Sequence, residues 1–192
     1  MKALKIILII AGILVAAMLI IPLFLPPTTE VSAETEIELK PMQIYPAIAS
    51  FEHREEWDPW VTMDTTAEVN IQPVPGYVGS TYMWEGEMLG TGRMEVDSVV
   101  ENEYVMSSLW FGDVETPAVI EWDLEPTGEG TRVVWSYEER TTYPFNRLRM
   151  LIGKPFLKRS FETGLENLKS YLEENPPEMS YLGEISVETR PA

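Results

Sequence analysis

The chain lacks cysteine altogether and has a single histidine, His53, among its 192 residues. Without cysteine it can form no disulfide, and no thiol can serve as a catalytic nucleophile. Zinc sites in proteins are built mainly from cysteine and histidine side chains, so a zinc site is not expected. We expect no metal ion and no other cofactor, and a folded domain in this chain must be stabilised by packing alone.

Basic residues are also scarce, with 14 Lys and Arg against 31 Asp and Glu and a formal net charge of −17. Nucleic acids are polyanions that attract basic surfaces, so this balance argues against a nucleic-acid partner. Residues 140–159 are the exception, because they contain six basic side chains and no acidic one: Arg140, Arg147, Arg149, Lys154, Lys158 and Arg159. This segment is either a site for phospholipid headgroups or a carboxylated ligand, or a solvated face that offsets nearby acidic strands.

Charged and hydrogen-bonding side chains are absent from residues 6–27, and Lys2 and Lys5 lie just before this run. As a helix, residues 6–25 would span about 30 Å, which is the thickness of the hydrocarbon core of a bilayer. We therefore predict a transmembrane anchor in residues 1–28. Because positive charge is retained on the cytoplasmic side, the chain is predicted to cross the cell membrane once, with its N-terminus cytoplasmic and the following domain extracytoplasmic.

A cleaved secretory signal peptide is the alternative, since it also begins with a basic region followed by an apolar stretch. Signal-peptide cores usually run for about 7–15 residues, which is shorter than this run. The small-residue pattern Val31-Ser32-Ala33 lies inside the segment that we predict as the first strand, so cleavage there would remove part of that strand. The uncleaved anchor is therefore the favoured interpretation.

The rest of the chain changes from helical to alternating periodicity and back again. Residues 31–39 predict a strand, and residues 42–51, with apolar side chains three and four positions apart, predict a short helix followed by a helical turn at 52–57. Later runs predict antiparallel strands joined by loops rich in glycine or proline: residues 80–85, 94–99, 104–111, 118–125 and 131–138. Residues 145–172 return to helical spacing, and Pro155 should kink or break that helix.

This order of elements predicts an α+β fold. Ile120, Trp122 and Leu124 would share one face of a strand and acidic residues the other, as in a sheet with one wet side. The last helix would pack its apolar stripe on the apolar face, giving a helix-grip fold: a curved antiparallel β-sheet wrapped around a long C-terminal α-helix, preceded by one transmembrane helix. A hollow can remain between sheet and helix. The predicted divisions are the anchor at 1–28, the domain at 29–175 and a flexible tail at 176–192.

Several short motifs follow one another along the predicted domain. They are FEHREEWDPW at 51–60, GSTYMW at 79–84, GTGRM at 90–94, GTRVVW at 130–135 and FETGLENLK at 161–169. In this order they resemble the START-like (SRPBCC) superfamily, in particular its polyketide cyclase/dehydrase-related branch, over about residues 31–172. The resemblance implies a helix-grip fold with a deep hydrophobic cavity for lipids, polyketides or other apolar molecules. It does not imply catalysis, because one fold hosts many functions.

Aromatic and methionine side chains on separate strands, with apolar residues of the last helix, are the candidate ligand-binding residues. In a solid core they would be packing residues. In a hollow domain of the kind that the resemblance implies, they would line the cavity, and methionine would provide an adaptable surface. The candidates are Tyr82, Trp84, Met94, Met106, Trp110, Trp122, Trp135, Tyr137, Ile152 and Phe156, and the sequence leaves open which face Trp110 lies on. The segment Trp57-Asp58-Pro59-Trp60 is a lip at the cavity mouth, a bilayer contact, or a loop held by its two tryptophans.

Three functions remain open from the sequence. The leading hypothesis is a membrane-tethered binding domain whose partners are the membrane and a hydrophobic or lipid-like small molecule. The first alternative is an enzyme of the polyketide cyclase/dehydratase type, with candidate acids and bases Asp64, Glu85, Arg93, Tyr104 and Tyr137. No acid and base among them are paired at a meaningful spacing, so no catalytic residue is predicted. The second alternative is an envelope protein-interaction module that docks through residues 140–159. The sequence does not indicate the oligomeric state.

Overall fold

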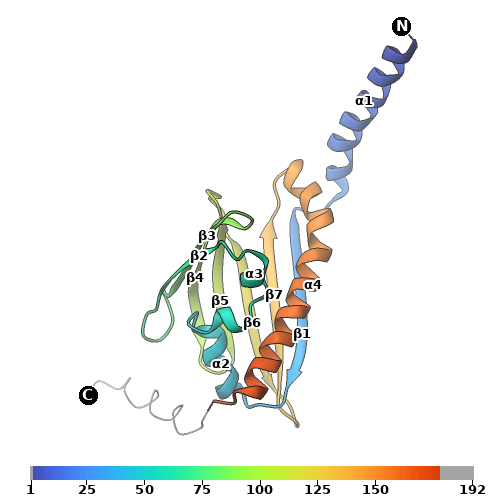
Figure 1. Cartoon of the computed structure of the whole chain (residues 1–192). Coiled ribbons are helices and arrows are strands. Elements are labelled where there is room, and N and C mark those ends of the chain that lie inside the picture. Colours follow the sequence, from blue (N-terminus) through green and yellow to red (C-terminus); the bar gives the residue numbers. More distant parts are fainter. Residues whose placement is uncertain (1, 178–192) are drawn as a thin grey trace.

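The computed structural model describes residues 2–177 of the chain. It begins with the helix α1 (Lys2–Ile20) and the short 3-10 helix η1 (Ile21–Phe24), which lead away from the rest of the molecule (Figure 1). The stretch Ala3–Phe24 is long and apolar enough to cross a bilayer, and nearly all of it is exposed. A signal sequence has the same properties, so α1 is compatible with both interpretations. Most of the predicted tail, residues 178–192, lies outside the described part.

A seven-stranded antiparallel sheet forms the body of the molecule, in the order β1-β7-β6-β5-β4-β3-β2. The strands are β1 (Thr28–Ile37), β2 (Glu68–Gln72), β3 (Thr81–Gly86), β4 (Gly90–Val100), β5 (Tyr104–Phe111), β6 (Ala118–Pro126) and β7 (Thr131–Arg140). The register between β4 and β5 shifts between Val96 and Ser98. Such bulges increase the local twist of a sheet, and this sheet is curved (Figure 1).

Four helical elements complete the domain. The helix α2 (Pro41–Ala49), the 3-10 helix η2 (Arg54–Glu56) and the helix α3 (Pro59–Met63) connect β1 to β2. The long helix α4 (Phe145–Glu174) runs beside β1 across the concave side of the sheet (Figure 1). It buries one apolar stripe there, made of Phe161, Leu165, Leu168 and Leu172. The predicted α+β helix-grip fold is confirmed.

The strands alternate between a buried inner face and a wetter outer face. In β6 the residues Ile120, Trp122 and Leu124 are buried, and in β7 the buried residues include Val133, Trp135 and Tyr137. Trp122 and Trp135 lie directly opposite one another across the two strands. This alternation is the period of two that the sequence showed, and it directs the largest aromatic side chains toward α4.

The strand register shows which strand ends lie at the edge of the sheet where α1 joins it. Thr28 at the start of β1 pairs with Arg140 at the end of β7, and Ala118 at the start of β6 pairs with Leu109 near the end of β5. The β3–β4 turn, the β5–β6 loop and the connection from β7 to α4 therefore all lie at this end of the sheet. We call it the α1 end.

Two short elements and one proline differ from the sequence expectations. The helix α3 and the strand β2 were not predicted, because each has only five residues and lies beside loop-forming sequence. Of the kink or break expected at Pro155, the break does not occur, because α4 continues through Pro155 to Glu174. Pro155 is exposed, so its ring meets solvent and not a neighbouring element. The strands β4 and β7 are longer than predicted, since β4 starts at Gly90 and β7 reaches Arg140.

Candidate functional site

A cavity of about 380 Å³ lies between the concave face of the sheet, α3 and α4. Its volume falls at the small end of the range of about 300–1,000 Å³ that is typical of small-molecule sites. Its walls are mostly apolar, and side chains from the six strands β2 to β7 line them together with residues of α4. The buried apolar and aromatic part of the wall consists of Tyr82, Met94, Leu109, Ile120, Trp135, Tyr137 and Phe161.

The cavity opens on one side, toward the α1 end. Leu89 in the β3–β4 turn and Leu157 in the first half of α4 are half-buried, Phe111 at the end of β5 is exposed, and all three line the cavity. Trp60 of α3 completes this rim, and its ring packs edge-on against Phe156 of α4 with the ring centroids 5.7 Å apart. The mouth is therefore built from the loops and helix turns at the α1 end.

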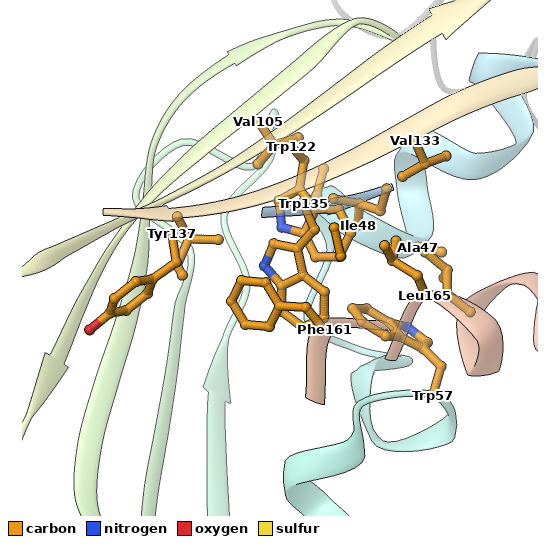
Figure 2. Close-up of a cluster of buried hydrophobic side chains, with 14 of the residues drawn as sticks. Ala47, Ile48, Trp57, Val105, Trp122, Val133, Trp135, Tyr137, Phe161 and Leu165 are labelled. Carbon is orange, nitrogen blue, oxygen red and sulfur yellow. The ribbon is translucent and has the colours of Figure 1, made fainter. Parts of the chain in front are cut away.

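A stack of aromatic rings forms the side of the cavity nearest α4 (Figure 2). Trp135 lies between Trp122 and Phe161, with centroid distances of 4.4 Å and 4.1 Å and nearly parallel rings. Trp57 meets Trp122 and Trp135 edge-on, with its centroid 5.8 Å and 6.1 Å from theirs. Such pairs stabilise by about 0.5–1.5 kcal/mol beyond the area that they bury. The tryptophans thus fix one rigid wall and leave the adjoining space open.

A buried ion pair interrupts the apolar wall. Arg54 of η2 donates through Nε to the carboxylate of Asp58, and both side chains are almost fully buried. The guanidinium carbon lies 5.4–5.8 Å from the ring centroids of Phe51, Trp57 and Tyr82. Asp58 also accepts a hydrogen bond from the backbone N–H of Trp60 at 3.0 Å, which caps the start of α3. The pair therefore holds η2 and α3 against the sheet and places a polar group inside the cavity.

Asp64 organises the loops at the mouth. Its carboxylate accepts hydrogen bonds from the backbone N–H groups of Thr66, Met88 and Leu89 at 3.0, 2.7 and 2.9 Å, and from the Thr66 hydroxyl at 2.5 Å. These donors lower the pKa of Asp64 to about 2, the hydroxyl of Thr66 making the largest contribution. The carboxylate is ionised at neutral pH, and it ties the segment after α3 to the β3–β4 turn.

Tyr137 of β7 lines the cavity with its aromatic ring and carries a polar hydroxyl group. Its hydroxyl donates to Glu139 at 2.8 Å, and Glu139 pairs with Arg149 of α4, also at 2.8 Å. Burial, and next the charge of Glu139, raise the pKa of Tyr137 well above its usual value. The phenol therefore stays neutral, and it connects the cavity wall to the first half of α4.

The structure brings half of the predicted ligand-binding residues together at the cavity. Tyr82, Trp84, Met94, Trp135 and Tyr137 line it. Trp122 is buried behind Trp135 and supports the wall without lining it.

The remaining four predicted residues do not line the cavity. In β5 the inward residues are Val105, Ser107 and Leu109, so Met106 and Trp110 lie on the outer face, where Arg93 stacks on Trp110 at 4.1 Å. Ile152 and Phe156 lie on the outward side of α4, 82% and 51% exposed. The helix directs Met150, Leu157 and Phe161 inward in their place. The site that we propose below leaves these four residues out.

Of the five candidate acids and bases, only Asp64 and Tyr137 reach the cavity. Glu85 and Arg93 are exposed, and the hydroxyl of Tyr104 donates to Glu121 on the outer face. Arg54 was not predicted from the sequence, and Asp58 was considered only within the segment Trp57-Asp58-Pro59-Trp60; both lie in a stretch of charged residues with no periodic signal. Within residues 2–177 no cluster of three or more metal-ligating side chains occurs.

Residues 28–173 match the model of a protein family described as polyketide cyclase / dehydrase and lipid transport. This range covers the whole sheet and nearly all of α4. No functionally curated protein matches the chain at a significant level.

Solved structures of other proteins share the fold. Protein MLL2253 from Mesorhizobium loti is 18% identical with a TM-score of 0.56, and TTHA0849 from Thermus thermophilus is 21% identical with a TM-score of 0.55; each comparison covers 78% of this chain and 100% of the other. DynU16, described as a protein in the dynemicin biosynthetic locus, is 14% identical with a TM-score of 0.54, and the match covers 75% of this chain and 47% of DynU16. At these identities the likeness shows the fold alone.

Proposed function

The chain belongs to the family described as polyketide cyclase / dehydrase and lipid transport, and we propose that it binds one hydrophobic or lipid-like small molecule in the cavity between the sheet and α4. The observation that carries this proposal is a mostly apolar cavity of about 380 Å³ that is lined by residues of the hydrophobic core. Protein interiors are normally packed without voids of this size, because each unfilled volume sacrifices contacts. Space of this kind is retained where a ligand fills it.

The walls indicate the kind of ligand. Rings of Trp135, Phe161 and Tyr82 favour a flat or chain-like apolar body, while Arg54 and Asp58 add a charged pair beside the Tyr82 ring. A molecule with an apolar body and a hydrogen-bonding group suits both surfaces. The volume, at the small end of the usual range, favours one chain or a compact ring system over a whole two-chain phospholipid.

We further propose that α1 tethers the domain to the cell membrane, with the N-terminus cytoplasmic and the domain outside. The lysines at positions 2 and 5 support this orientation through the preference for positive charge on the cytoplasmic side. The mouth of the cavity lies at the α1 end of the sheet, which faces the lipid in which α1 would sit. An apolar ligand dissolved in the bilayer would then have a short path into the cavity.

A cyclase or dehydratase activity is the second candidate function. The family description and the polar groups in the cavity wall favour it. The geometry favours it less than binding, because Asp64 already accepts four hydrogen bonds and the hydroxyl of Tyr137 already donates to Glu139. A catalytic role for Tyr137 predicts that Tyr137→Phe abolishes turnover of a bound ligand while its binding survives.

Mass spectrometry of the full chain, extracted gently from membranes, tests the binding proposal. We expect a stoichiometric apolar molecule to stay bound, and a neutral naphthylamine probe to replace it with a rise in fluorescence. Leu157→Trp should fill the mouth and abolish both signals, because Leu157 lines the cavity. Thr163→Trp is the matched control, since Thr163 is exposed on the same helix and does not line the cavity. Absence of any bound molecule together with absence of probe binding would refute the proposal.

A further inference from the structure

The first half of α4 carries a second apolar stripe that points away from the core. Phe145, Ile152 and Phe156 are spaced seven and four positions apart, so they share one face of the helix. They are 62%, 82% and 51% exposed. The helix packs on the sheet with a different face, through Met150 and Phe161. Large exposed apolar side chains in a row are unfavourable in water, and they mark a surface that contacts something else.

The stripe ends halfway along the helix. The same face continues through Thr163, Ser170 and Glu174, all of them polar and exposed. The outward face is thus apolar near the α1 end and polar at the far end, although both halves belong to one continuous helix. A solvated helix would have no reason to differ in this way between its two halves.

The sign of the charge along α4 changes at the same point as its exposed apolar stripe ends. Residues 145–159 contain five basic side chains and no acidic one, whereas residues 160–174 contain Lys169 and four glutamates. Arg149 is paired with Glu139, but Lys154, Lys158 and Arg159 are exposed and have no ion-pair partner among the described residues. On a chain of net charge −17 this is a local cationic surface beside an apolar stripe. That combination is typical of helices that lie in the interface of a bilayer.

The position of this surface agrees with such a role. The hydroxyl of Tyr143 donates to the carbonyl of Leu19 at 2.7 Å, and Arg147 donates to the carbonyl of Pro22 at 3.0 Å. The start of α4 is therefore fastened to the base of α1 (Figure 1). The exposed aromatic side chains of the described residues also all lie at this end: Phe24, Phe111, Tyr143, Phe145 and Phe156.

We propose that residues 145–159 of α4 bind the surface of an anionic bilayer, with Phe145, Ile152 and Phe156 among the headgroups and Lys154, Lys158 and Arg159 next to the phosphates. Each basic side chain near an anionic surface strengthens binding roughly fivefold. This surface fixes the orientation of the domain on the membrane, with the rim of the cavity beside the lipid. The inference does not depend on whether the cavity holds a ligand.

The absence of cysteine allows a direct test with single labels on the full chain. An environment-sensitive fluorophore is attached through Ile152→Cys, and in a matched variant through Ser170→Cys, which lies on the same face about five turns further on. Each chain is reconstituted into vesicles of phosphatidylcholine with phosphatidylglycerol, and into vesicles of phosphatidylcholine alone, with brominated lipids as quenchers. The assay contains no cavity ligand, so its result is separate from that of the binding experiment.

In the anionic vesicles we expect loss of most of the fluorescence at position 152 and almost no quenching at position 170. Quenching at 152 should fall strongly in the neutral vesicles and after Lys158→Glu with Arg159→Glu. Equal quenching at the two positions, or in the two lipid compositions, would overturn the proposal. A label at 152 that is shielded from iodide but not quenched by brominated lipid would assign the stripe to a protein contact, which also overturns it.

Discussion

The guanidinium of Arg54 and the carboxylate of Asp58 both lie in the cavity wall, with each side chain 4% exposed. Moving two charges out of water is unfavourable, and their mutual attraction, together with the rings around Arg54, offsets that cost. If one partner is removed, the other remains as a buried charge with no counter-ion. Replacing either Arg54 or Asp58 alone should therefore destabilise the protein strongly. Replacing both together should destabilise it less than the two single losses combined.

We expect Arg54→Met to lower the free energy of unfolding by about 3–5 kcal/mol, because the buried Asp58 carboxyl group would lose its ion-pair partner. Asp58→Asn should also destabilise, although its amide oxygen can still accept the hydrogen bond from Trp60. The double variant should lose less than the sum of the two single losses, since neither charge is then left alone. Urea unfolding of the chain in detergent, followed by tryptophan fluorescence, measures all three.

Arg132→Met is the matched control for this cycle. Arg132 pairs with Glu34 and Glu125 on the outer face, where its side chain is 45% exposed. Exposed ion pairs contribute about 0–1 kcal/mol, so this variant should unfold at nearly the wild-type urea concentration. Equal losses for Arg54→Met and Arg132→Met would contradict the view that burial makes the Arg54 pair sensitive.

The sequence predicted the inward direction of some cavity residues but not of others. Tyr82, Trp135 and Tyr137 lie in runs with a clear period of two, so their inward direction followed from the alternation. Arg54 lies in the run EHREEW, which is typical of an exposed turn. Its burial depends on Tyr82, which is distant in sequence and brought close only by the fold. No local pattern can place such a contact.

At the level of elements, the sequence predicted the long regular segments. It did not predict which residues of β5 face inward. The apolar stripe of α4 and the alternation in β6 and β7 identified both layers of the fold, and the structure confirms them. Residues 104–111 are apolar or small at most positions, so alternation alone does not say which face of β5 turns inward. The outer position of Trp110 follows from its pairing with Arg93, an exposed residue of β4.

Gly164 permits the closest approach between α4 and the aromatic wall. A Cβ atom at this position would lie 2.7 Å from the ring of Trp135 and 3.0 Å from Pro59, closer than side chains tolerate. We expect Gly164→Ala to destabilise the protein by about 1–3 kcal/mol, the usual cost of overpacking, even though alanine is the better helix former. Thermal unfolding by near-UV circular dichroism, which reports the packing of Trp135, measures this effect.

Gly153→Ala is the matched control within the same helix. A Cβ atom there would meet only the sulfur of Met150, at an ordinary 3.6 Å. Alanine should therefore stabilise α4 by about 0.5–1 kcal/mol through its higher helix propensity. If both variants were stabilised to a similar extent, Gly164 would not be limited by its contact with Trp135, and α4 would be free to move away from the cavity wall.

At the scale of the whole molecule, three features meet at the α1 end. The apolar helix α1 joins the sheet there, the cavity opens there, and the cationic half of α4 begins there. The opposite end carries α2 and the last turns of α4, whose outward side chains are polar and acidic. A tethered protein that exchanges an apolar molecule with a bilayer needs the cavity mouth at the same end as the anchor. A mouth at the other end would face water.

The position of β1 allows a test that distinguishes an anchor from a cleaved signal. The small-residue pattern Val31-Ser32-Ala33 lies within β1, and Val31 and Ala33 are buried opposite Tyr137 and Trp135 of β7. A chain that begins at Thr28 keeps all of β1 and should give the near-UV circular dichroism of the packed tryptophans. A chain that begins at Glu34 lacks six of the ten residues of β1, exposes the edge of β7, and should aggregate. In membranes we expect the intact N-terminus by mass spectrometry. A folded, mature protein whose first residue is Glu34 would show that α1 is a cleaved signal and would remove the tether.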